Sequence, residues 1–281
     1  MITRFAPSPT GPLHLGHAFS ALTAFDMAAQ ESGTFLLRIE DIDRSRFRPE
    51  WEAQIAEDLR WLGLQWPQPV VRQSDRLPIY AEALNRLTEL GLTYACVCNR
   101  RDIRQAASAP QEGTPQVGPD GIVYPGTCKH AGHDLEDSAI RLHMNRALDL
   151  VGPVEFNETG PERTGIHRIP AEMMMSEVGD VVLARRDMGT SYHLSVVVDD
   201  AAQGITHVVR GLDLFEATPI HVLLQKLLDL PRPVYHHHRL IRDATGKRLA
   251  KRDDARAIAA YRAEGLSPAD IRELAGLTPA P

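Results

Sequence analysis

The first forty residues constrain the fold most, because the hydrophobic period changes twice within them. Residues 2–6 predict a short strand that ends before Pro7 and Pro9. Apolar side chains then recur three and four residues apart, as on one face of an α-helix, at Ala18, Leu22, Phe25 and Ala29. Residues 34–39 alternate between two faces and predict a second strand. A strand, a helix and a strand in this order are typical of a parallel βαβ crossover, which predicts an α/β fold.

The same patterns predict further elements of a parallel sheet. Residues 192–198 and 205–210 are nearly continuous apolar runs, which favours two strands buried on both faces. Helical periodicity is found at 51–62, 79–90 and 219–228, with short helices expected near 253–264 and 268–275.

Residues 94–190 show weaker helical periodicity than the rest of the chain. Proline and glycine interrupt this stretch, all three cysteines lie in it, and strands are expected at 140–144 and 181–184. We therefore expect three parts. They are a Rossmann-like domain formed by 1–93 and 191–235, an inserted α+β subdomain at 94–190, and a basic loop with a helical C-terminal region at 236–281.

Charge and cysteine content limit the partners and the compartment. With 31 Lys and Arg against 37 Asp and Glu, the net charge is −6, so any contact with RNA must be made by a local patch. The N-terminus has no apolar signal-peptide core, and no run reaches the roughly 18 apolar residues of a membrane span. An odd number of cysteines argues against a disulfide framework. We expect a cytoplasmic monomer without membrane contact.

The turn after the first strand, Pro7–His17, carries the first candidate site. His14 and His17 lie three residues apart at the expected start of a helix, so both imidazoles share one face. Backbone N–H groups and the positive end of the helix dipole make this place suitable for an anion. Gly16 leaves room for a flat ring or a phosphate. From spacing alone, a helix start with two incidental histidines is an equal alternative.

The whole run from Arg4 to His17 is far more specific than its parts, and it resembles the glutamyl branch of the class I aminoacyl-tRNA synthetases. The signature HIGH of that class is here His14-Leu15-Gly16-His17. The resemblance implies that His14, Gly16 and His17 take the phosphates and the ribose side of ATP, with Mg²⁺ bridging the phosphates.

Charged residues at two strand ends fit an amino-acid subsite. Glu40 follows the second strand, and Arg210 ends an apolar strand before Gly211. Burying an arginine there is costly unless it meets an anion, which a ligand or a structural ion pair could supply. Asp41 and Asp43 could hold Mg²⁺, although a solvated strand end is favoured for them.

The resemblance assigns roles to these residues. It implies that Glu40 receives the amino group of glutamate, and that Arg4, Tyr192 and Arg210 recognise this substrate. A guanidinium fork matches a carboxylate bidentately, so two arginines suit a dicarboxylate. The segment that wraps around glutamate would consist of Arg4, Phe5, Ala6, Pro7 and Ser8.

The region 239–256 is locally basic, with seven basic residues against three acidic ones. Such a run is often only a solvated face. By the resemblance, Arg248-Leu249-Ala250-Lys251-Arg252 stands where the family has its KMSKS loop, with arginine for the first lysine and alanine for the serine. Lys251 keeps the second lysine, which the family places on the ATP phosphates. For His236–His238, alternation along an extended segment favours packing at the ATP site or burial over a metal site.

Cys96, Cys98 and Cys128 have a spacing that fits a structural Zn²⁺ site lacking one ligand, with three free buried cysteines as the alternative. The candidates for the fourth ligand are Tyr124, His130 and His133. General chemistry favours His130. The resemblance favours Tyr124, because short members of the glutamyl branch carry Cys-x-Cys and Tyr-x3-Cys, and it implies that the inserted subdomain holds the acceptor end of tRNA.

The resemblance covers nearly the whole chain, but only the catalytic half of a full glutamyl-tRNA synthetase. It is closest to short members that lack an anticodon-binding domain. Those members activate L-glutamate with ATP and place it on the queuosine base in the anticodon of tRNA(Asp), and we expect the same reaction here. Three alternatives stay open: a fragment that charges the 3′ end of tRNA(Glu), a nucleotidyltransferase with a HIGH-type site, and a zinc-containing RNA-binding module.

Overall fold

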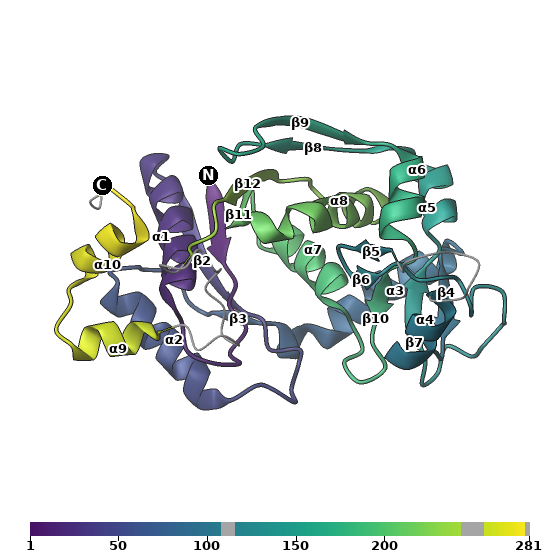
Figure 1. The fold of residues 1–281 in the computed structure, drawn as a ribbon, viewed down its shortest axis with the longest axis horizontal. Helices are drawn as coiled ribbons and strands as arrows, with labels where there is room; N and C mark the ends of the chain where they lie inside the picture. The colour runs from purple at the N-terminus through teal and green to yellow at the C-terminus, as the bar shows by residue number, and fades with distance from the viewer. Residues whose placement is uncertain (108–115, 243–255, 279–281) are drawn as a thin grey trace.

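The computed structural model describes residues 1–107, 116–242 and 256–278 (Figure 1). The expected βαβ unit is present, since its two strands are parallel and a helix connects them. A short third strand continues the sheet in the order β1-β2-β3. The elements are β1 (Ile2–Phe5), α1 (Leu15–Gln30), β2 (Thr34–Ile39) and β3 (Val71–Arg72).

A second sheet lies against the first along β1. It has the order β11-β12-β8-β9, with three parallel strands and an antiparallel edge strand. The two sheets adjoin where the backbone N–H of Thr206 donates to the carbonyl of Ile2, at 3.0 Å. The strands are β8 (Val154–Glu158), β9 (Gly165–Ile169), β11 (His207–Gly211) and β12 (Val234–His238).

Helices cover the sheets on both sides, and the expected helices are confirmed where the structure describes them. They are α2 (Pro49–Trp61), α3 (Leu77–Glu89), α7 (Tyr192–Ala202), α8 (Thr218–Leu227), α9 (Ile258–Ala263) and α10 (Pro268–Ala275). No helix in the described ranges is long and apolar enough to cross a membrane.

The expected strand at 192–198 is wrong, because this segment forms α7. Ser191 caps the helix by accepting a hydrogen bond from the backbone N–H of Leu194, at 3.3 Å. Residues His193 to Asp200 are all buried. A helix buried all round has no polar stripe, so its sequence shows the continuous apolar run that also typifies a central strand.

The segment 94–190 contributes to three sheets, the smallest of which is the antiparallel pair of β5 (Val117–Gly118) and β6 (Gly121–Ile122). Its antiparallel sheet has the order β10-β7-β4, and the strands expected at 140–144 and 181–184 are confirmed in β7 and β10. Strands β8 and β9, from the same segment, belong instead to the second sheet, where Glu158 of β8 pairs with Tyr235 of β12. The division of the chain into domains therefore stays a prediction.

The remaining elements are β4 (Thr93–Cys96), α4 (Arg100–Ala107), β5 (Val117–Gly118), β6 (Gly121–Ile122), β7 (Ala139–Leu142), α5 (Met144–Val151), α6 (Ala171–Met173) and β10 (Val182–Ala184), with the short helical turns η1 (Gln73–Arg76), η2 (Met174–Val178) and η3 (Leu212–Ala217).

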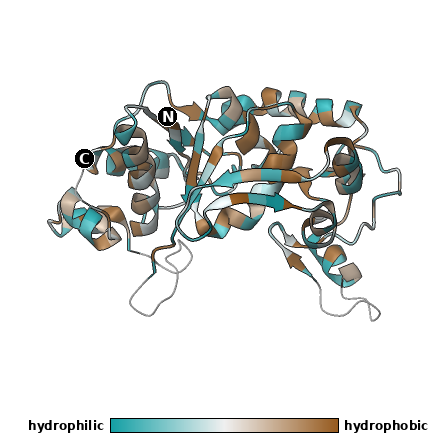
Figure 2. Cartoon of the chain, turned by 90° about the horizontal axis from the view of Figure 1, so that it is seen from above, coloured by the Kyte–Doolittle hydropathy of each residue, from teal (hydrophilic) through white to brown (hydrophobic). Residues whose placement is uncertain are grey.

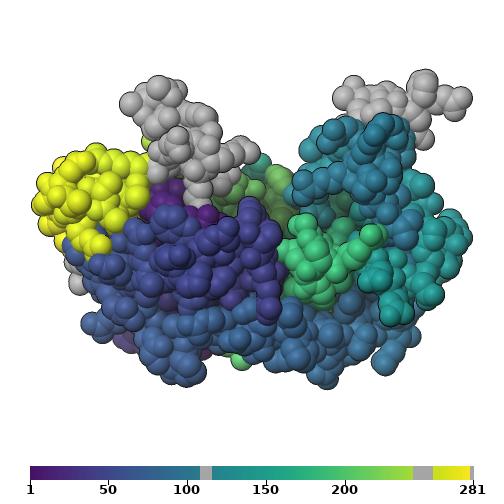
Figure 3. Space-filling view, turned by 90° about the horizontal axis from the view of Figure 1, so that it is seen from below, coloured from purple at the N-terminus to yellow at the C-terminus, as the bar shows by residue number. Residues whose placement is uncertain are grey.

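Two apolar cores hold these layers together. One lies between α3, α5, α7, α8 and the second sheet, and the other joins α1, α2 and the first sheet to the C-terminal helices. Ile258 and Ile271 are fully buried in the latter, and Arg272 pairs with Asp26 of α1, at 2.8 Å. Figure 2 shows apolar residues along the central strands and polar ones on the outer loops. Figure 3 shows a hollow between the C-terminal helices and the 94–190 segment.

Candidate active site

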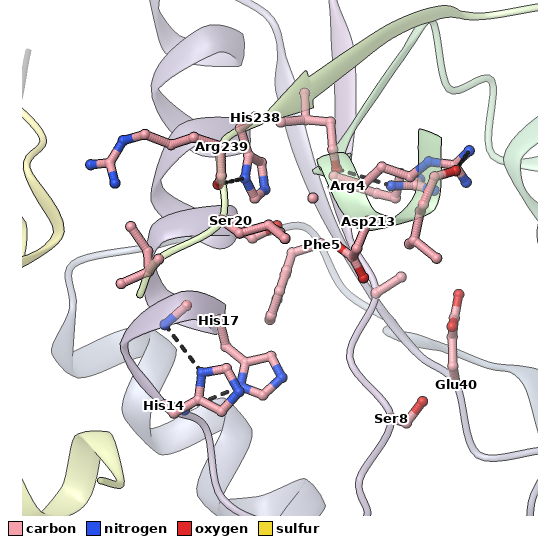
Figure 4. Close-up of a pocket in the computed structure, with 18 of the residues that line it drawn as sticks. Arg4, Phe5, Ser8, His14, His17, Ser20, Glu40, Asp213, His238 and Arg239 are labelled. Atoms are coloured by element: carbon pink, nitrogen blue, oxygen red, sulfur yellow. Dashed lines mark hydrogen bonds between the residues drawn. The ribbon is translucent and has the colours of Figure 1, made fainter. Parts of the chain in front are cut away.

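A cavity of about 540 Å³ opens where β1, β2, β11 and β12 end (Figure 4). Ligands of open parallel sheets bind at this edge. Ten of the site residues expected from the sequence line it: Arg4, Phe5, Ala6, Ser8, His14, Gly16, His17, Glu40, Tyr192 and Arg210. Pro7 lies beside it, because its carbonyl accepts the backbone N–H of Glu40, at 3.1 Å. The whole KMSKS-like loop, Lys251 included, lies outside the described residues.

His14 and His17 form the lower wall in Figure 4, with ring centroids 3.7 Å apart. Their Nδ1 atoms accept hydrogen bonds from the backbone of Gly16 and of His14, each at 3.1 Å, which makes a reciprocal cap of α1. The backbone N–H groups of His14 and Gly16, which the sequence analysis expected to bind an anion, thus donate to the two histidine rings instead. Because Nδ1 accepts, each neutral ring carries its proton on Nε2, the atom that can donate to a phosphate.

Gly16 has a specific steric role in this arrangement. A Cβ at this position would lie 3.0 Å from Cε1 of His14. The absent side chain therefore makes room for the ring of His14 rather than for the ligand itself.

Arg4, on β1, is clamped by a carboxylate. Its Nε and Nη2 donate to the two oxygens of Asp200, at 3.0 and 3.2 Å, and Nη1 donates to the carbonyl of Val209. Arg38 also binds Asp200, at 2.7 Å, and lies 3.3 Å from Glu40. Although burial opposes it, the two guanidinium groups lower the pKa of Asp200. A buried chain of alternating charges thus connects Arg4 to Glu40.

Glu40 and Tyr192 add a cation acceptor and a hydroxyl to the cavity. Burial raises the pKa of Glu40, against the opposing effect of Arg38 and Arg4. An ammonium group beside this carboxyl would lower the pKa again, so the position suits a cationic ligand group. Burial also raises the pKa of Tyr192, so its phenol stays protonated and can donate.

Arg210, at the end of β11, is only 5% exposed and has different surroundings. Nε donates to Nε2 of His237 and Nη1 to Nδ1 of His221, each at 3.0 Å. Nη2 donates to the hydroxyl of Thr218 at 2.9 Å and to the carbonyl of Leu214 at 3.2 Å. Within the described chain it forms no ion pair, so the ion-pair alternative raised by the sequence does not hold for the residues that the structure describes.

The structure adds lining residues that sequence reasoning missed. Asp213 and Leu214 follow β11 in η3, and Ser20 stands one turn after His17 on α1. Spacing from His17 could have indicated Ser20, but no sequence pattern marked the others. The further lining residues are Val209, Gly211, Arg239, Leu240 and Ile241, together with His238, for which the sequence favoured packing at the ATP site or burial.

His237, His238 and the two aspartates are held by hydrogen bonds and burial within the described chain. His237 is bonded to Glu158 and Arg210, and His238 lines the cavity, where burial lowers its pKa to about 4. Asp41 is buried rather than solvated, because both its oxygens accept from Ser74, at 2.8 and 2.6 Å. Asp43 binds neighbouring side chains, so neither aspartate offers a prepared Mg²⁺ position.

The three cysteines meet at the carboxyl end of β4. Their sulfurs lie within 4.8 Å of one another, and in the described ranges this is the one such group of potential metal ligands. The hydroxyl of Tyr124 lies 3.3 Å from the sulfur of Cys96 and 3.5 Å from that of Cys98. His130 and His133 are exposed and do not belong to the group. Four donors at these separations fit a tetrahedral ion with Zn–S bonds of about 2.3 Å.

Comparison with known proteins agrees with this geometry. A family model described as tRNA synthetases class I (E and Q), catalytic domain, matches residues 1–278. A protein of Rhodobacter capsulatus named glutamyl-Q tRNA(Asp) synthetase is 67% identical over 282 residues, which cover 99% of this chain and 100% of the relative. A protein of Nocardia farcinica with the same name is 42% identical, covering 99% and 86%.

Solved structures support the same fold. A glutamate tRNA ligase from Elizabethkingia meningosepticum superposes with a TM-score of 0.76 at 27% identity, covering 98% of this chain and 60% of that one. This chain therefore spans about three fifths of the length of that structure. Mycobacterium tuberculosis methionyl-tRNA synthetase, at 11% identity and a TM-score of 0.62, shares the fold. The chain belongs to the class I tRNA synthetases of the E and Q type, a family of ligases, and within it to the group of the glutamyl-Q tRNA(Asp) synthetases.

Proposed function

We propose that the chain activates L-glutamate with ATP and transfers the glutamyl group to the queuosine base in the anticodon of tRNA(Asp). The observation that carries the activation step is one cavity that combines a paired histidine wall, a carboxyl with a raised pKa and two buried arginines. The choice of tRNA and base rests on the names of relatives that match the chain over nearly its whole length.

In the activation step the α-carboxylate of glutamate attacks the α-phosphorus of ATP in line, and pyrophosphate leaves. The carboxylate is already ionised, so no general base is needed, and the protein acts by positioning and by charge stabilisation. His14 and His17 offer Nε2–H donors to the phosphates and the ribose side, beside Gly16. Mg²⁺ enters with ATP as part of the substrate.

Lys251 is proposed to stabilise the charge that develops on pyrophosphate. The described residues on both sides of its loop lie at the cavity. Ile241 lines the cavity, and Ala257 pairs with His14. Lys251 lies between Ile241 and Ala257 in the sequence, and both of these residues are at the cavity, which supports a role for its ammonium group there.

Glutamate is proposed to bind between Glu40, which receives the ammonium group, and the cationic side formed by Arg4 and Arg210. Tyr192 donates to a carboxylate, and residues Phe5 to Ser8 close the subsite. Among amino acids only glutamate should then support exchange of pyrophosphate into ATP.

Transfer of labelled glutamate tests the complete reaction. The purified chain is incubated with ATP and with tRNA(Asp) that carries or lacks queuosine, and the label is located after nuclease cleavage. We expect label in the anticodon of the queuosine-containing tRNA only. A parallel incubation contains tRNA(Glu), and label at its 3′ end would indicate a fragment of the ordinary synthetase. Absence of glutamate-dependent exchange would favour a nucleotidyltransferase or an RNA-binding module.

We also propose one structural Zn²⁺ bound by Cys96, Cys98, Tyr124 and Cys128. Elemental analysis should find one zinc per chain. Tyr124→Phe should weaken zinc binding measured by competition with a chelator, because it removes the one oxygen donor of the cluster. His130→Ala serves as the matched control and should bind like the unaltered protein. A loss with His130→Ala alone would reassign the fourth ligand.

A further inference from the structure

Two histidine rings, those of His237 and His221, accept hydrogen bonds from the buried guanidinium of Arg210. Arginine has five N–H donors and no acceptor, so every partner of its guanidinium must accept. Four of the five donors are bonded within the described chain, to His237, His221, Thr218 and Leu214. The fifth, on Nη1, is left for the cavity that Arg210 lines.

The first histidine, His237, has its tautomer fixed from both sides. Nε2 accepts from Arg210, so the proton lies on Nδ1, which donates to Oε2 of Glu158. The other oxygen of Glu158 accepts the backbone N–H groups of His237 and Gly160, at 2.8 and 2.5 Å. The carboxylate is fully buried and holds three donors, so it is itself fixed in place.

The chain of hydrogen bonds from Arg210 through His237 to Glu158 is called the first relay. A second relay runs from Arg210 through His221 and His193, and in His221 the protonated nitrogen is Nε2 instead of Nδ1. Nδ1 of His221 accepts from Arg210, so Nε2 carries the proton and donates to Nδ1 of His193, at 3.1 Å. His193 then carries its proton on Nε2, which lies 3.4 Å from Oδ1 of Asp120 in the β5–β6 turn. Each relay thus begins at Arg210 and ends at a carboxylate.

We propose that His237, His221 and His193, with Glu158 and Asp120 at the outer ends, are positioning residues that set the orientation of Arg210 for the carboxylate of the substrate. The proposal rests on the proposed function, since it assigns Arg210 to glutamate. Burial is the main cause that lowers the pKa of His221 and of His237, and it keeps both rings neutral acceptors. The relays fix the direction of the guanidinium without neutralising its charge.

Glu158→Gln tests the first relay with little change in shape. The amide oxygen would take the two backbone N–H groups, which leaves its NH₂ facing Nδ1 of His237. That ring would then carry its proton on Nε2, opposite the Nε–H of Arg210, and the two donors would repel. We expect the KM for glutamate in ATP–pyrophosphate exchange to rise about 10–100-fold, as for a lost hydrogen bond to a charged group, while the KM for ATP stays nearly constant.

Glu155→Gln, on the exposed face of the same strand, is the matched control and should leave both constants unchanged. An equal glutamate KM in the two variants would overturn the proposal. If unaltered protein shows no glutamate-dependent exchange, the proposed function fails instead.

His221 provides a second, independent pair of variants. His221→Asn can place its Oδ1 where Nδ1 accepts from Arg210, whereas His221→Leu has no acceptor. We expect the leucine variant to raise the glutamate KM roughly tenfold and asparagine to restore most of the affinity. Equal KM values for the two would contradict the relay even if Glu158→Gln fails to fold.

Discussion

Arg4 and Arg210 come from adjacent strands, line one cavity and are 4% and 5% exposed, yet they are held in different ways. A carboxylate, that of Asp200, grips Arg4 through two hydrogen bonds. Uncharged groups alone grip Arg210 in the described chain. The first arrangement balances a buried charge and joins α7 to β1 and β2. The second leaves Arg210 without a carboxylate partner in the described chain, as the proposed glutamate site requires.

Removing the carboxylate from the Arg4 side should have the largest effect. Asp200→Asn leaves Arg4 and Arg38 without their shared counter-ion, and breaking a buried pair costs about 3–5 kcal/mol of unfolding free energy. Urea denaturation at neutral pH measures this loss. Asp187→Asn, at an exposed pair with Arg185, is the control and should change stability by less than about 1 kcal/mol. A similarly small loss for Asp200→Asn would show that Arg4 needs no balancing charge.

Replacing each arginine by lysine separates the two roles in activity. Arg210→Lys keeps a charge but cannot serve four acceptors in a planar fork, so kcat/KM for glutamate should fall about 10²–10³-fold. Arg4→Lys can still pair with Asp200 and should lose about tenfold less. Pyrophosphate exchange at varied glutamate gives both values. Equal losses would show that the two cations contribute alike.

Acid should act on the Arg210 side through Glu158. Although burial opposes it, hydrogen bonds from His237 and Gly160 lower the pKa of this carboxyl to about 2, from an ordinary value of 4.5. A lowered pKa gives stability that is present above pH 4.5 and is lost as the pH falls towards 2, on the order of 3 kcal/mol. Denaturation midpoints between pH 6 and pH 2.5 should fall less steeply for Glu158→Gln. Parallel curves would contradict this linkage.

The smallest effect is expected at Thr218, one of two acceptors for Nη2 of Arg210. Thr218→Val removes the hydroxyl at 2.9 Å but leaves the carbonyl of Leu214. The glutamate KM should rise about 3–10-fold, as for a single modest hydrogen bond. A rise as large as that of Glu158→Gln would place Thr218 above the histidine relay in fixing the guanidinium.

The sequence allowed much of the cavity to be predicted, because its motifs are contiguous or lie at strand ends. Residues 4–17 form one run, Glu40 follows β2 and Arg210 lies near the end of β11, and the topology brings these strand ends to one edge. Their supporting partners could not be predicted, since Asp200 is 196 residues from Arg4 and Glu158 is 79 from His237. Such pairs are fixed only by tertiary packing.

The helix α7 shows the limit of hydrophobic patterns. Its apolar run, Tyr192 to Val198, predicts a strand because every side of the helix is buried and leaves no polar face. The serine cap at Ser191 was the local signal for a helix. Because a strand was expected to end at Val198, the contact of Asp200 with Arg4 was not predicted. Asp200 reaches Arg4 from the last turn of α7.

The long separation between Arg4 and Asp200 has a consequence for the order of events on the ribosome. β1 and β2 are synthesised first, yet Asp200, the carboxylate that Arg4 and Arg38 share, follows 196 and 162 residues later. At about 5–20 residues per second, the N-terminal strands wait on the order of 10–40 s before their charges can be paired. During that time Arg4 and Arg38 lack this carboxylate, so the buried contact between α7 and the first two strands cannot form. Folding of this cavity is thus a late event that unites the two ends of the nascent chain.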